Sequence, residues 1–449
     1  MGIQEKFAVV LLFVTLLCAS APAQNTTAQP DNAALMQKIR DLEDRLIALE
    51  GQIRTMKEHQ AAAPQPAPGA TQPPGTEALG TQAGTPTPPT QVPVAPLPSA
   101  TSTAATSEAG TQAGVLGGAG ASAAKLLNPD ISMIGDFISV AGHNPVQPSP
   151  SLEMHESELG LQAIIDPYAR GDFFLTFGEE GVGLEEGYIT FTALPAGFVG
   201  RVGKMRAAFG KVNTLHNHVL PWVDRPLVTN SLVGGEDGID DAGVSLEHIL
   251  PAPKGIFLDA TGQMFRGDSG DVEHPLFKAS SKSDLSMVAH LRGYRDITES
   301  TNLDLGVSYS RGHNDVGTNF LTQLYGVDAT FRWKPLRRAI YHSFVGRSEF
   351  IWSQRQQFPS EQRAFGFYTS GDYQLGRRWF VGGRYDHSDR AEFARLTDQG
   401  GSALLTYWPS EFSQIRGQYR FTRYAGAVDA HEVLLQAIFS LGAHGAHPF

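Results

Sequence analysis

The spacing of apolar residues divides the chain into three parts. In residues 31–59, apolar side chains recur at alternating intervals of four and three, which predicts a helix with a heptad seam. Residues 60–125 show no such period and consist mainly of Pro, Ala, Gly, Thr and Gln, which predicts a disordered linker. Across residues 127–449, apolar and polar residues alternate with a period of two, so this part is expected to form β-strands.

The alternating part contains about 16 segments, each close to the ~10 residues that a tilted membrane strand needs. Short, turn-like connections alternate with longer polar connections between these segments. A soluble sandwich has no reason to alternate in this way, whereas an outer-membrane barrel has tight turns at one end and long loops at the other. The predicted fold is therefore all-β, a transmembrane antiparallel barrel of about 16 strands, with about 14 to 18 as the range that pattern reading allows.

Aromatic residues beside the short connections agree with this fold, since aromatic girdles mark the membrane interfaces of barrels. They are Tyr168, Phe198, Trp333, Trp379, Tyr407 and Trp408. The C-terminal residue, Phe449, is the expected signal for the barrel assembly machinery.

The N-terminus predicts export. Residues 7–18 are apolar, and Ala21-Pro22-Ala23 follows as a small-residue cleavage site, so residues 1–23 are expected to be a signal peptide. Cys18 is the one cysteine of the chain, but Leu17 precedes it where a lipoprotein would carry a small residue, so a lipid anchor is the less favoured alternative. The expected destination is the outer membrane.

The heptad seam of residues 31–59 is narrow and flanked by charges, which favours a self-associating coiled coil, expected as a periplasmic stalk, over an amphipathic helix that packs on another element. Its core positions are Leu35, Ile39, Leu42, Leu46, Leu49, Ile53 and Met56. Ile at a with Leu at d favours two strands in isolation.

Charge excludes one class of partner. The net charge is −11 and no long Lys/Arg cluster occurs, so a nucleic-acid partner is not expected. In the barrel, charges fall on the face opposite the apolar one and therefore towards an aqueous lumen, where rings of charge sort ions. The candidates for the pore lining and constriction are Arg201, Lys204, Arg206, Lys211, Arg225, Arg347, Arg384, Arg416 and Arg420.

The longest polar connection, residues 206–240, is the third loop at the outer end. It begins with basic residues, carries His216 and His218, and ends in an acidic run. A loop of this length in a compact barrel is usually functional or disordered.

The stretch Gly200-Arg201-Val202-Gly203-Lys204-Met205-Arg206-Ala207-Ala208-Phe209-Gly210-Lys211-Val212-Asn213 resembles the strand-to-loop motif of the phosphate-selective porin O/P family. Arg206 and Phe209-Gly210 match that motif in type, whereas Ala208 stands where proline is typical. The resemblance implies a loop folded into the pore, passage of small solutes or anions, and a homotrimer.

The sequence thus predicts a porin-like channel for passive diffusion of small hydrophilic solutes or ions, embedded in outer-membrane lipid. The alternative is a receptor or tether without an open pore, for ligand or metal uptake or for anchoring to the cell wall. No catalytic motif and no cofactor is predicted, so the protein is not expected to be an enzyme. No metal site is predicted either, because neither His216 with His218 nor His444 with His447 has a neighbouring Cys or a spaced third ligand.

Overall fold

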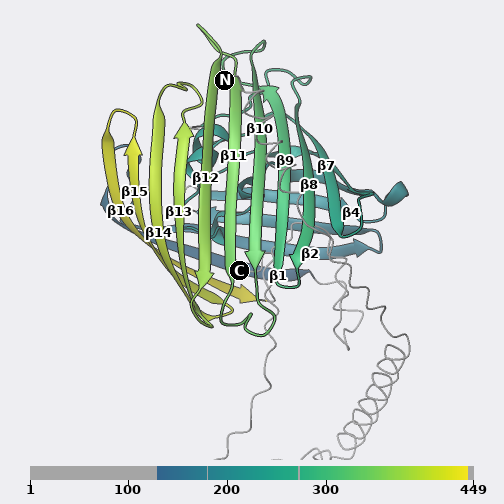
Figure 1. Cartoon of the computed structure of the whole chain (residues 1–449). Helices are drawn as coiled ribbons and strands as arrows, with labels where there is room; N and C mark the ends of the chain where they lie inside the picture. The colour runs from purple at the N-terminus through teal and green to yellow at the C-terminus, as the bar shows by residue number, and fades with distance from the viewer. Residues whose placement is uncertain (1–128, 179–180, 272–273, 443–449) are drawn as a thin grey trace, which may run out of the picture. The chain divides into compact units, whose positions relative to one another are not determined.

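The computed structural model describes residues 129–178, 181–271 and 274–442. They form a closed antiparallel barrel of sixteen strands, in which each strand pairs with its neighbours in sequence and β16 closes on β1 (Figure 1). This confirms the predicted fold and strand number. The predicted signal peptide, coiled coil, linker and assembly signal at Phe449 lie outside the described residues.

The strands are β1 (Asp130–His143), β2 (Leu152–Asp166), β3 (Ala169–Gly178), β4 (Gly181–Phe191), β5 (Val199–Arg206), β6 (Asp240–Leu250), β7 (Ile256–Phe265), β8 (Ser286–Thr298), β9 (Thr301–His313), β10 (Leu321–Trp333), β11 (Phe344–Arg355), β12 (Gln362–Gln374), β13 (Trp379–Asp389), β14 (Thr397–Ser410), β15 (Ser413–Tyr424) and β16 (Val428–Gly442). We call the connection between β5 and β6, residues 207–239, L3, and the connection between β7 and β8, residues 266–285, L4.

Connections of different length separate the two ends of the barrel, as predicted, with exceptions at both ends. At the loop end, residues 425–427 make a tight turn, because Gly426 and Ala427 adopt positive φ angles of 85° and 60°. At the turn end, residues 334–343 form a connection that is longer than most of those at the loop end. The strict alternation of short and long connections is therefore wrong at these places, and also between β3, which ends at Gly178, and β4, which begins at Gly181. L3 and L4, the longest connections between the strands, both lie at the loop end.

Side chains alternate between the two faces of the wall. In β16, Val433 and Leu435 are 54% and 49% exposed on the outside, whereas Glu432 and Gln436 are 2% and 1% exposed on the inside. Apolar side chains on the outer face are the surface that lipid tails cover. The ring centroids of Trp379 and Tyr407 lie 4.5 Å apart, with the rings tilted by 32°, near the turn end, where an aromatic girdle was predicted.

In the described residues, four short helices accompany the strands. They are η1 (Pro195–Gly197), η2 (Val212–Thr214), η3 (Asn217–Val219) and α4 (Leu227–Leu232). The last three belong to L3. None of the helices in the described ranges is long and apolar enough to cross a lipid bilayer.

The main hydrophobic core lies inside the barrel, and L3 builds it. Sixteen strands enclose more space than wall side chains can fill, and L3 folds inward instead of extending outward. Its apolar side chains, including Phe209, Trp222 and Val228, are fully buried against inward-facing wall residues such as Leu324 and Tyr368. Part of the lumen is therefore occupied by packed apolar side chains, and water is confined to what remains.

The outward apolar face gives a prediction about depth in the membrane. Leu435 lies in the middle of β16 and Leu441 near its turn end, and both face outward. We expect Leu435→Arg to lower the free energy of unfolding from lipid bilayers by about 2–4 kcal/mol, and Leu441→Arg by only about 0–1 kcal/mol, because a cation costs most at the bilayer midplane. Equilibrium unfolding in denaturant measures both; equal losses would contradict this placement.

Candidate constriction site

L3 is held inside the barrel by three groups of wall contacts, and the first lies on β9 and β11. The backbone N–H groups of Lys211 and Val212 both donate to Glu349 Oε1 at 2.8 Å. The ammonium of Lys211 lies 2.8 Å from Asp304 Oδ2, and the N–H of Gly210 donates to the hydroxyl of Ser308 at 2.9 Å. A buried loop must have its backbone groups satisfied in this way, because unpaired ones are costly.

The second group centres on Asp224, near the middle of L3. Its Oδ2 lies 2.9 Å from nitrogens of both Arg384 on β13 and Arg420 on β15. Arg416, also on β15, donates to the backbone carbonyls of Leu220 and Trp222 at 2.9 and 3.0 Å. Arginine, with five donors in a rigid fork, can satisfy several acceptors at once.

The indole of Trp222 joins the charged and apolar parts of this group. The guanidinium of Arg384 lies 4.9 Å from the centre of the Trp222 ring, and Tyr368 meets that ring edge to face at 5.0 Å. A cation over an aromatic face and an edge-to-face pair each add stabilisation beyond burial. The helix α4 then packs against β12 and β13, and the N–H of Leu227 donates to Asp386 at 3.3 Å.

The third group lies on β2 and β4. The Nδ1 of His216 is 2.5 Å from Glu158 Oε2, and its Nε2 is 2.8 Å from Glu186 Oε2. Arg206, at the end of β5, forms an ion pair with Glu185 at 2.6 Å. Since β11, which carries Glu349 of the first group, lies across the barrel from β2 and β4, L3 is fastened to separate parts of the wall and spans the interior between them.

Neighbouring charges keep the side chains of Asp224 and His216 ionised, although both are inside the barrel. Burial alone would raise the pKa of Asp224, but Arg384 and Arg420 hold it well below its ordinary value. Burial alone would lower the pKa of His216, but Glu185, Glu158 and Glu186 raise it well above its ordinary value. The carboxylate of Asp224 therefore stays ionised at neutral and mildly acidic pH.

The nine predicted lining residues fall into two groups. Arg206, Arg225, Arg384 and Arg416 are 3–7% exposed and hold L3 to the wall or to itself. Their guanidinium groups are therefore largely covered by protein. Partly exposed are Arg201, Lys204, Lys211, Arg347 and Arg420.

A set of arginines lies on the inner wall towards the turn end, and we call them the turn-side arginines. Arg292 is buried, whereas the other four are partly accessible. Each forms an ion pair with a carboxylate on its own or a nearby strand. They are Arg170, Arg201, Arg292, Arg332 and Arg347, and their partners are Asp172, Glu247, Asp304 (shared by Arg292 and Arg332) and Asp372. Charges of both signs therefore face this part of the lumen.

Several anchoring residues were not singled out by the sequence. Glu349, Glu185 and Glu186 on the wall and Asp224 within L3 make the contacts that hold the loop, and none of them is among the predicted lining residues. The sequence could have indicated these contacts, because the basic and histidine residues of the loop need acidic partners, and acidic residues occur at inward-facing positions of the strands.

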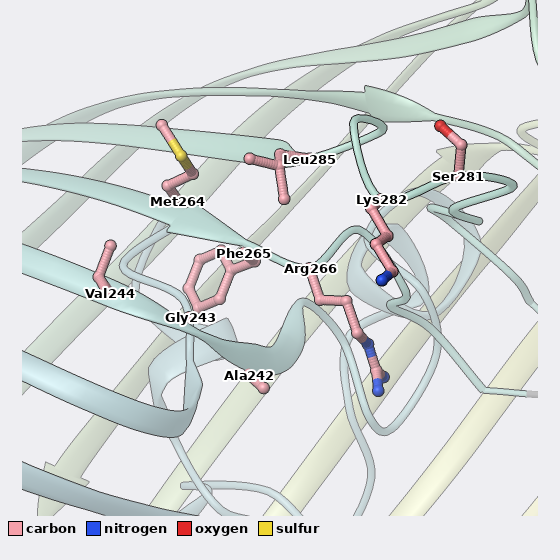
Figure 2. Close-up of a pocket in the computed structure, with 9 residues that line it drawn as sticks. All are labelled: Ala242, Gly243, Val244, Met264, Phe265, Arg266, Ser281, Lys282 and Leu285. Atoms are coloured by element: carbon pink, nitrogen blue, oxygen red, sulfur yellow. The ribbon is translucent and has the colours of Figure 1, made fainter.

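A shallow groove of about 360 Å³ lies on the wall between β6, β7 and L4. Figure 2 shows Val244, Met264 and Leu285 along it, with Arg266 and Lys282 to one side. Val244, Met264 and Leu285 are among the exposed apolar residues of the barrel. The groove is therefore part of the apolar outer surface and not of the constriction.

No family model matches the chain. An uncharacterized protein of Aquifex aeolicus (strain VF5) is 27% identical over 388 residues, which cover 72% of this chain and 81% of that protein. Among solved structures, the anion-selective porin from Comamonas acidovorans is 12% identical with a TM-score of 0.49, covering 70% of this chain and 99% of the other. The outer membrane channel DcaP of Acinetobacter baumannii is 12% identical with a TM-score of 0.48, covering 70% and 96%.

The assignment of the fold rests on the chain's own geometry. A closed antiparallel barrel of sixteen strands with an apolar outer face and a polar inner face is the architecture of outer-membrane porins. The chain therefore has a porin-like, outer-membrane β-barrel fold.

The Asp224 contacts predict how firmly L3 is held. We expect Asp224→Asn to lower the free energy of unfolding by about 3–5 kcal/mol, because it leaves Arg384 and Arg420 without their shared counter-charge. Hydrogen exchange of the α4 backbone should accelerate in the same variant. Asp429→Asn, which breaks an exposed pair with Arg423, is the control and should change neither quantity.

Because the pKa of Asp224 is depressed in the folded state, its contribution is present above the ordinary pKa of an aspartate and is lost as the pH falls through the depressed value. The wild type should therefore keep slow exchange in α4 at mildly acidic pH. Fast exchange in α4 already at neutral pH would contradict the anchoring role of Asp224.

Proposed function

We propose that the protein is a porin-like channel of the outer membrane, through which small hydrophilic solutes or ions diffuse passively, and that L3 sets its constriction. The observation that carries this proposal is the inward fold of L3, fastened to charged groups on separate parts of the wall. A loop held in this way narrows a wide barrel without closing its ends. Passive diffusion needs no catalytic group, so we propose a channel and not an enzyme.

The charges that meet a solute in this proposal are the turn-side arginines and their carboxylate partners. Arg201 and Arg347 keep 30% and 26% of their side-chain surface accessible. Because carboxylates accompany both, the lumen should accept ions of either sign with modest preference. Solute size, limited by L3, is then the main criterion for passage.

A phosphate-specific channel of the porin O/P type is less well supported. In the motif that resembles that family, Arg206 lies 2.6 Å from Glu185 and Lys211 lies 2.8 Å from Asp304. Both cations are thus engaged by carboxylates, which compete with an incoming phosphate. We therefore favour a general channel over a phosphate-selective one.

We further propose export by the signal peptide of residues 1–23 and assembly as a homotrimer, with residues 31–59 as a periplasmic stalk joined to the barrel by the linker of residues 60–125. The heptad pattern supports self-association. The number three rests on the resemblance to trimeric porins. Insertion by the barrel assembly machinery through Phe449 belongs to the same proposal.

A receptor or tether without an open pore is the second candidate. The observation that favours it is the apolar cluster of L3, which fills part of the barrel and reaches wall residues on β10, β11, β12 and β14. A barrel kept shut by this cluster would conduct only after L3 moved.

Conductance separates the two candidates. We expect the purified protein in planar bilayers to give steady, voltage-independent conductance, in steps of three if it is a trimer. A protein that inserts, by heat-modifiable mobility and circular dichroism, but conducts no current would support the receptor or tether.

Ion selectivity tests the turn-side arginines. We expect Arg201→Gln combined with Arg347→Gln to shift the reversal potential in a salt gradient towards cations. The permeability ratio should change several-fold, because a charge at ~4 Å in water contributes about 1 kcal/mol. Arg423→Gln, at the exposed loop end, is the matched control. An unchanged reversal potential in the double variant would remove these residues from the conduction path.

A further inference from the structure

The third anchor of L3 gathers an unusual set of side chains in one place. His216 and His218 from L3 meet Glu156 and Glu158 from β2 and Glu185 from β4, and we call these five residues the His–Glu cluster. One potential ligand atom each from Glu158, His216 and His218 lies within 4.8 Å of the others, and the same holds for Glu156, Glu158 and Glu185. Both histidines are buried, with 0% and 2% of their surface exposed.

The distances in the His–Glu cluster suit a small cation. The Nδ1 of His216 lies 3.3 Å from Glu185 Oε2, and the Nδ1 of His218 lies 3.9 Å from Oε2 of both Glu156 and Glu158. Zinc bonds to nitrogen and to carboxylate oxygen are about 2.0–2.2 Å long, so tetrahedral ligands stand about 3.3–3.6 Å apart. The closer contact from His216 to Glu158, at 2.5 Å, is one that an ion would open by about 1 Å.

His216 contacts a neighbouring carboxylate through its second ring nitrogen, as metal-binding histidines usually do. While Nδ1 of His216 faces the cluster, its Nε2 lies 2.8 Å from Glu186 Oε2. In metal sites the second ring nitrogen of a ligating histidine typically donates to a carboxylate, which fixes the tautomer and orients the ring. The rings of His216 and His218 lie 5.7 Å apart at an angle of 77°, which lets both present a nitrogen to one point.

The carboxylates of the cluster outnumber its histidines, and a protonated His216 would give up its Nδ1 proton when a metal ion binds. Within the described residues, Glu156 Oε2, Glu158 Oε1 and Glu185 Oε2 are buried oxygens without a hydrogen-bond partner. Arg206 pairs with Glu185 through its other oxygen, Oε1. Buried carboxylates are costly unless they are paired or coordinate a metal.

We propose that the His–Glu cluster binds one divalent transition-metal ion, Zn²⁺ being the best fit, through His216, His218 and Glu158, with Glu156 or Glu185 as a fourth ligand. Imidazole together with carboxylate suits zinc and its neighbours, whereas Ca²⁺ and Mg²⁺ prefer oxygen alone. Since both histidines are buried, the ion would not be cargo. It would clip L3 to β2 and β4.

A metal site was not predicted from the sequence, although His216 and His218 are two residues apart, because the other proposed ligands lie far from them in the chain. Glu158 is 58 residues from His216 and reaches it only through the inward fold of L3. The structure thus supplies the third ligand that the local sequence lacks.

Zinc binding by the untagged, full-length protein in detergent tests this proposal. After removal of metal with a chelator, titration with Zn²⁺ against a chromophoric competitor should give one tight site, and Co²⁺ should give the visible absorption of a tetrahedral ion. We expect His218→Gln and Glu158→Gln to weaken binding at least ten-fold, and Glu186→Gln, which removes the orienting carboxylate, by about 10- to 100-fold.

His342→Gln, on the exposed turn end, is the matched control and should bind as the wild type does. Glu158→Gln preserves the shape of the side chain, so it keeps the test open if a histidine variant does not fold. Equal zinc uptake by the wild type, His218→Gln and Glu158→Gln would overturn the proposal, as would the absence of the tetrahedral Co²⁺ spectrum in the wild type.

Discussion

The inward fold of L3 depends on one requirement, that wall side chains satisfy the backbone of a loop buried inside the barrel. Glu349 accepts two consecutive amides of L3, and Arg416 donates to two of its carbonyls. These side chains sit on strands whose inner face would otherwise meet water. A buried amide or carbonyl without such a partner is costly, so the polar wall is what makes an internal loop possible.

This requirement limits which charges are available for function. Arginines that hold L3, such as Arg384 and Arg416, are buried, whereas Arg347, which has the same inward parity on its strand, is partly exposed. The inner wall is thus divided between a region that holds the loop and a region, towards the turns, that faces the lumen. Charge counting along the strands cannot separate the two, since both carry Arg beside Asp or Glu.

The strands could be predicted from the sequence because their period of two is a local property. The closed barrel, the inward and outward faces, and the position of L3 as the third outer loop all follow from it. The contacts of L3 do not follow, because they join residues far apart: Lys211 and Glu349 are separated by 138 positions. The roles of Arg206 and Arg384 depend on such contacts. Periodicity could place these residues on the inner face but could not tell which of them anchor the loop.

The order of L3 and its anchors along the chain has a consequence for biogenesis. Glu349, Arg384, Arg416 and Arg420 lie on β11, β13 and β15, all of which come after L3 in the chain. L3 therefore cannot settle into its final position until nearly the whole wall has been laid down beside it. An assembly intermediate that still lacks its last strands would be an open sheet in which L3 is held only by its contacts with the earlier strands β2, β4 and β9. The final constriction would form only when the last strands close the barrel.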